Sequence, residues 1–133
     1  MNMNLKALIS AFAFLLAGSL LAVDLQEDIK LHLECAAQCD RCIENGPGAD
    51  YVKACQDCAA TCRYTAIMMA NQSALCEQAH GICDLACQTC AKQCSSSEDP
   101  DCKRCVEACN ACLAACPKHQ AAERAAQAAA KQN

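Results

Sequence analysis

Residues 83–116 read CDLACQTCAKQCSSSEDPDCKRCVEACNACLAAC, and this stretch decides the fold. Its cysteines recur three or four residues apart on both sides of a polar break at Ser95–Asp99. Steps of three and four residues keep side chains on one face of an α-helix. The stretch therefore predicts two helices, each with a stripe of cysteine where an ordinary bundle has Leu and Ile.

Two further helices are predicted before this stretch, at about residues 24–44 and 50–70, each with three cysteines in the same spacing. Asn-Gly-Pro-Gly at 45–48 separates them. The third helix follows a polar turn at 71–73 and ends near Cys94. There is no alternating β pattern. Four helices with short connections predict an all-α fold, an antiparallel up-down-up-down four-helix bundle with a cysteine-lined core.

Short polar residues stand where the last three predicted helices begin. Asp50, Ser73 and Asp99 are expected to cap them, because such side chains accept hydrogen bonds from the free N–H groups of a first turn. Pro100 suits the first position of the fourth helix. Pro117 is expected to kink or end that helix, since proline removes a backbone hydrogen bond.

The N-terminus has the composition of a targeting segment. In residues 1–22, Lys6 precedes an apolar run from Ala7 to Ala22, as in a cleavable secretory signal peptide. The run is shorter than the about 20 residues that a membrane span needs. We therefore expect a periplasmic protein with no membrane attachment after cleavage. The rest divides into the bundle, 23–119, and an Ala-rich C-terminal extension, 120–133.

Composition restricts the function further. Cleavage would change the formal net charge from −4 to −5, because Lys6 is the only charged residue removed, and an acidic chain argues against a nucleic-acid partner. The chain has 16 Cys in 133 residues and no Trp. A core of Cys and Ala would be underfilled, whereas protein interiors are densely packed. Something other than side chains is expected to fill it.

The cysteine spacing favours a soft metal ion over disulfides within a helix. Residues four apart have Cβ atoms about 5–6 Å apart, whereas a disulfide needs about 3.8 Å. A metal ion held between two sulfurs spans the larger gap, and Cu(I) prefers thiolate and accepts few ligands. We expect several Cu(I) ions per chain, held by Cys35, Cys39, Cys42, Cys55, Cys58, Cys62, Cys76, Cys83, Cys87, Cys90, Cys94, Cys102, Cys105, Cys109, Cys112 and Cys116.

Three histidines and a methionine continue the cysteine stripe. These are His32, Met69, His80 and His119, and the antiparallel topology places all of them at one end of the bundle. Met68 is the alternative to Met69. Imidazole and thioether exchange Cu(I) more readily than thiolate does, so we expect these residues to be metal ligands at an entry for copper.

Other functions remain open from the sequence alone. Cysteines on different helices can pair as disulfides, which export permits. Four converging thiolates can bind zinc. Residues 105–117 follow Cys-x3-Cys-x2-Cys-x3-Cys-Pro, an iron–sulfur run except that its first spacing is one residue too long. No cysteine stands out with a base beside it, so no enzymatic activity is predicted.

The cysteine steps from Cys35 to Cys116, with the His/Met end, resemble those of the bacterial copper storage proteins, a family of cysteine-rich four-helix bundles. The resemblance covers most of the mature chain. It implies Cu(I) bound mainly by thiolates within each bundle, storage rather than catalysis, and a homotetramer of bundles.

Overall fold

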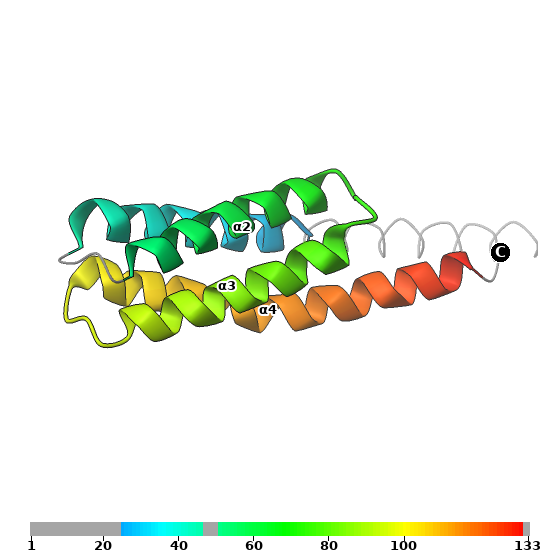
Figure 1. The fold of residues 1–133 in the computed structure, drawn as a ribbon. Coiled ribbons are helices and arrows are strands. Elements are labelled where there is room, and N and C mark those ends of the chain that lie inside the picture. The colour runs from blue at the N-terminus through cyan, green and yellow to red at the C-terminus, as the bar shows by residue number, and fades with distance from the viewer. Residues whose placement is uncertain (1–24, 47–50, 132–133) are drawn as a thin grey trace, which may run out of the picture.

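In the computed structural model, which describes residues 25–46 and 51–131, the chain is helical and has no strand among those residues. The helices lie side by side in an elongated bundle (Figure 1). They are the first helix (residues 25–45), α2 (Val52–Ala70), α3 (Cys76–Cys94) and α4 (Pro100–Ala130). The predicted all-α four-helix bundle is confirmed.

Consecutive helices run in opposite directions, because the connections between them are short (Figure 1). α3 packs against both α2 and α4. The first helix reaches α4 as well, since the sulfurs of Cys39 and Cys105 lie 3.5 Å apart. All four helices therefore surround one core.

The two ends of this core differ, and each is named here by its residues. The loop end contains Cys42, Cys55, Cys94 and Cys102, beside the connection from α3 to α4. The histidine end contains His32, Met69, His80 and Cys116, beside the turn from α2 to α3.

The start of α4 agrees with the cap predicted from the sequence. The backbone N–H groups of Asp101 and Cys102 donate to Oδ1 of Asp99 at 2.8 and 3.2 Å. These bonds satisfy donors that have no partner within the helix, which is what an N-cap does. Asp99 is thus the predicted cap.

The other two predicted caps have different outcomes. Ser73 does not cap α3: its hydroxyl accepts from the N–H of Leu75 at 3.2 Å, and the helix begins one residue later, at Cys76. Ser73 therefore stabilises the turn before the helix. Asp50 lies outside the described residues, and α2 begins after Tyr51, which makes no side-chain cap bond.

Of the two outcomes expected at Pro117, a kink or an end of the helix, the end is wrong. The helix continues through it to Ala130. Proline removes one backbone hydrogen bond, but the sequence after it is rich in alanine, which has the highest helix propensity. The far end of α4 projects beyond the turn between α2 and α3 (Figure 1).

The core has an unusual composition. All sixteen cysteines are buried, and the most exposed of them, Cys76, is 5% exposed. Large aliphatic side chains face outward instead, with Ile82 55% and Leu85 66% exposed. Cysteine therefore occupies the positions that large apolar residues fill in an ordinary bundle. Among the described helices, none has the length and apolar character needed to cross a membrane.

Candidate metal centre

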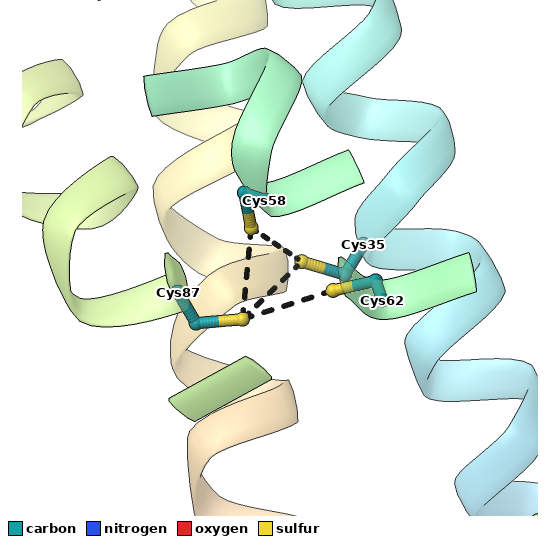
Figure 2. A group of neighbouring side chains, drawn as sticks. All are labelled: Cys35, Cys58, Cys62 and Cys87. Carbon is teal, nitrogen blue, oxygen red and sulfur yellow. Dashed lines mark hydrogen bonds between the residues drawn. The ribbon is translucent and has the colours of Figure 1, made fainter. Parts of the chain in front are cut away.

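Sulfur atoms from all four helices meet along the axis of the bundle. They form groups of four in which every Sγ lies within 4.8 Å of the others. Figure 2 shows one such group, with cysteines from the first helix, α2 and α3 pointing at one another. From the loop end onward, five of the groups are Cys42/Cys55/Cys94/Cys105, Cys39/Cys90/Cys105/Cys109, Cys35/Cys39/Cys58/Cys109, Cys35/Cys58/Cys62/Cys87 and Cys62/Cys83/Cys87/Cys112.

Each of these groups shares one or two cysteines with the next. Cys105 belongs to the first two groups, for example, and Cys62 and Cys87 belong to the last two. A metal ion in one group is therefore next to the ligands of another, and a shared thiolate can bridge two ions. The lining is continuous from the loop end to Cys83 and Cys112.

The close sulfur contacts mostly join different helices. Within one helix, Cys83 and Cys87 are 3.9 Å apart, as the four-residue spacing predicts. Between helices, Sγ–Sγ distances are 3.4 Å for Cys62–Cys83 and 3.0 Å for Cys42–Cys102. Sequence reasoning identified pairs along each helix and missed these groups across helices, because helix register is not encoded in local spacing.

The sulfur separations suit metal ions with three or four thiolate ligands. For a metal–sulfur bond of about 2.3 Å, sulfurs lie about 4.6 Å apart around a linear ion, about 4.0 Å around a trigonal one and about 3.8 Å around a tetrahedral one. Cys58 and Cys87 are 3.6 Å apart, and Cys39 and Cys90 are 3.9 Å apart. Small side-chain rotations convert such spacings into any of the three arrangements.

All sixteen cysteines are free thiols in the structure. The shortest contact described above, 3.0 Å between Cys42 and Cys102, is well beyond the about 2.05 Å of a disulfide bond. The arrangement is that of a thiol core and not of a disulfide-stapled one.

Burial keeps part of this core protonated in the absence of metal. Removal from water raises the pKa of Cys42 above its usual range, because a buried thiolate loses its hydration. The pKa of Cys116 is raised as well, by its hydrogen bond with Cys112 and then by burial. These thiols must lose their protons before they bind a metal ion.

Other thiols in the network are acidic. Hydrogen bonds from Cys105 and Cys39 lower the pKa of Cys55 to about 4. Hydrogen bonds that include one from Cys105 lower the pKa of Cys109 to about 6. A thiolate surrounded by donating thiols is stabilised in this way, so the core holds a few thiolates among neutral thiols.

The histidine end brings together residues that are far apart in the sequence. Nε2 of His32 lies 3.6 Å from Sγ of Cys116, and the rings of His32 and His80 are 5.5 Å apart, nearly perpendicular. Nδ1 of each ring donates to the carbonyl oxygen four residues earlier, at Asp28 (2.7 Å) and Cys76 (2.9 Å). Both rings are therefore held in fixed orientations.

The protonation of His32 is coupled to the neighbouring thiols. Burial alone would lower its pKa, but hydrogen bonds with Cys116 and Cys83 outweigh that effect and raise the pKa to about 10. The neighbouring thiols therefore favour the protonated imidazole more than burial disfavours it.

The remaining predicted ligands of this end have separate outcomes. Met69 is 1% exposed in the last turn of α2, whereas Met68 is only partly buried, so Met69 is the inward methionine. His119 belongs to α4, but its side chain lies outside the described residues.

Sequence reasoning missed one residue at this end. Asp84 has a buried carboxylate oxygen, and its side chain is one of the groups that raise the pKa of the Cys116 thiol. Asp84 is four residues after His80, on the same helix face. That spacing was the available signal, but from the sequence an acidic residue next to Cys83 is expected to face solvent.

A helical bundle lined by overlapping groups of free thiols defines a protein that holds many soft metal ions. The sequence matches the family described as copper storage protein (Csp) over residues 22–121. The chain belongs to the copper storage protein family.

The fold has a solved counterpart. The structure described as Cu(I)-bound copper storage protein BsCsp3 is similar, with a TM-score of 0.66 and 19% sequence identity, over 71% of this chain and 96% of that one. At this identity, the similarity shows the fold alone. No individually curated protein matches the sequence.

The raised thiol pKa values predict that Cu(I) binding releases protons and weakens as the pH falls. Thiols such as Cys42 and Cys116 stay protonated at neutral pH, so protons compete with the metal. Each proton displaced changes the apparent binding constant about tenfold per pH unit. Competition with a Cu(I) chelator at pH 6.5 and 7.5, corrected for the protonation of the chelator, measures the effect. Affinity independent of pH would contradict protonated thiols in the core.

Proposed function

We propose that this protein stores Cu(I), with several ions held at once by the thiolates that line the bundle core. One observation carries the proposal: free, buried cysteines form overlapping four-sulfur groups from the loop end to Cys83 and Cys112. Soft thiolate ligands select Cu(I), and shared ligands allow neighbouring ions to be packed closely.

Storage fits this arrangement better than one or two separate metal centres. A structural zinc site uses four ligands of its own, whereas Cys35 and Cys58 each belong to two groups. An iron–sulfur cluster held by the cysteines of α4 is also disfavoured. Cys109 and Cys112 belong to different four-sulfur groups, which include cysteines of other helices. The proposal assigns the protein no catalytic reaction.

The reduced protein is expected to bind on the order of 10–16 Cu(I) per chain, because one ion per thiolate is the ceiling. Anaerobic titration with a competing chelator measures this number. Cys105→Ser, which alters two groups, should lower it, whereas Ser96→Ala in the loop before α4 should not. Saturation at one or two Cu(I) ions per chain would contradict the storage proposal.

We also propose that copper enters at the histidine end, since His32 and Met69 are ligands that exchange faster than thiolate. His32→Ala and Met69→Leu should then slow loading severalfold and change capacity little. Stopped-flow absorbance of the Cu(I)–thiolate bands gives the rate, and Cys42→Ser at the loop end is the matched control, with normal initial rate. A large loss of capacity in the His32 or Met69 variant would instead make these residues main storage ligands.

The proposal includes export and assembly. The composition of residues 1–22 supports cleavage after export to the periplasm, and membership of the family supports a homotetramer. Outward apolar side chains on α3, Ile82 and Leu85 among them, offer surface for such contacts. Intact and native mass of protein from a periplasmic fraction checks both parts. A full-length chain in the cytoplasm, or a monomer, would refute the corresponding part.

A further inference from the structure

The loop end holds the closest pair of sulfur atoms described in the core. Sγ of Cys42, in the first helix, lies 3.0 Å from Sγ of Cys102, in the first turn of α4. The next shortest separation, between Cys62 and Cys83, is 3.4 Å. Non-bonded carbon atoms pack best at about 3.5–4.0 Å, and sulfur is larger than carbon. Two thiols therefore fit a separation of 3.0 Å poorly, whereas a covalent bond needs the sulfurs to approach by only about 1 Å more.

These two thiols contribute less than others do to the four-sulfur groups. Cys42 belongs to one of the five groups named above, and Cys102 belongs to none of those five. By contrast, Cys35 and Cys62 each belong to two of them. A bond between Cys42 and Cys102 therefore leaves four of the five groups complete.

The pair lies near an end of the bundle and not in its middle. Sγ of Cys94, the last residue of α3, lies 4.0 Å from Sγ of Cys42, and the connection that follows begins with two exposed residues, Ser95 and Ser96. Cys42 and Cys102 are themselves 0% exposed, so a reagent reaches them only when this end opens locally. Local opening costs least at loops and helix ends. The loop end therefore offers an oxidant a close pair of thiols near the surface.

We propose that Cys42 and Cys102 are a redox-sensitive pair, which closes to a disulfide when the metal-free protein meets an organic disulfide. The thiolate of one cysteine attacks a sulfur of the organic disulfide, forms a mixed disulfide and releases one thiolate. The other cysteine, as its thiolate, displaces the second half of the reagent and forms the bond between Cys42 and Cys102. The two protein thiols lose two electrons and two protons in total, and the organic disulfide becomes two thiols. An excess of a small thiol reverses the reaction.

The bond ties the first helix to α4 across a sequence separation of 60 residues. Such a cross-link stabilises a fold mainly by restricting the unfolded chain. It matters most in the absence of metal, because small cysteine side chains bury little apolar surface. A metal ion in the group Cys42/Cys55/Cys94/Cys105 holds Cys42 as a ligand and so prevents the bond. The empty protein is thus cross-linked under oxidising conditions, and the loaded protein is not.

The test treats reduced, metal-free protein with one equivalent of oxidised glutathione per chain under argon, which limits the product to one disulfide. Two of the 16 thiols should be lost, with no glutathione retained. Trypsin releases Cys42 in the peptide 42–53, which has no other cysteine, and releases Cys102 together with Cys94 in the peptide 93–103. After alkylation of free thiols, mass spectrometry should find these peptides joined through Cys102. The midpoint of thermal unfolding should rise by at least about 5 °C.

The matched variants are Cys102→Ser and Cys94→Ser, which change the same peptide at the same end of the bundle. Cys102→Ser should abolish the bond and the rise in the unfolding midpoint, whereas Cys94→Ser should keep both. Retained glutathione, a main product that joins other cysteines, or 16 remaining thiols would overturn the proposal.

These measurements need no copper, so their outcome does not depend on whether the protein stores Cu(I). A second arm, which alone rests on the proposed function, loads the protein with Cu(I) before the same treatment. The bond between Cys42 and Cys102 should then form at least about tenfold more slowly, because the metal occupies the thiolate of Cys42. An equal rate would overturn the link between this pair and metal loading.

Discussion

The close packing of sulfur against sulfur is the interaction on which the rest of this structure depends. Cysteines from facing helices meet at distances such as 3.5 Å for Cys39–Cys105 and 3.6 Å for Cys58–Cys87. Small side chains bury less apolar surface than Leu or Ile would, so the metal-free bundle gains little from its core. Metal–thiolate bonds between helices add stability that the apolar contacts do not supply. The same sulfur atoms therefore contribute both to metal binding and to the stability of the fold.

The same arrangement explains the surface. Because cysteine occupies the inward stripe, large apolar residues such as Ile67, Ile82 and Leu85 are left on the outside. Exposed apolar side chains that gather on one face are typical of an interaction surface. A core lined with cysteine thus leaves large apolar residues at the surface. Assembly into an oligomer is one way to cover these residues.

The core is chemically polarised along its length. The loop end offers thiols alone, and burial keeps Cys42 protonated until metal arrives. The histidine end adds imidazole and thioether, whose metal preferences differ from those of thiolate. The donor atoms that line the core therefore change from one end of the bundle to the other.

The helices, their antiparallel order and the buried cysteine stripe could all be read from the sequence, because three- and four-residue spacing and turn residues are local signals. Tertiary structure alone decided which sulfurs share a group, because the register between helices depends on packing across the core. It also set Cys116 beside Nε2 of His32. The sequence already favoured Met69 over Met68 but left open whether the helix continues past Pro117, and the structure has Met69 buried and α4 continuous. These features depend on contacts between distant parts of the chain, or on competing local effects of similar size, which spacing does not encode.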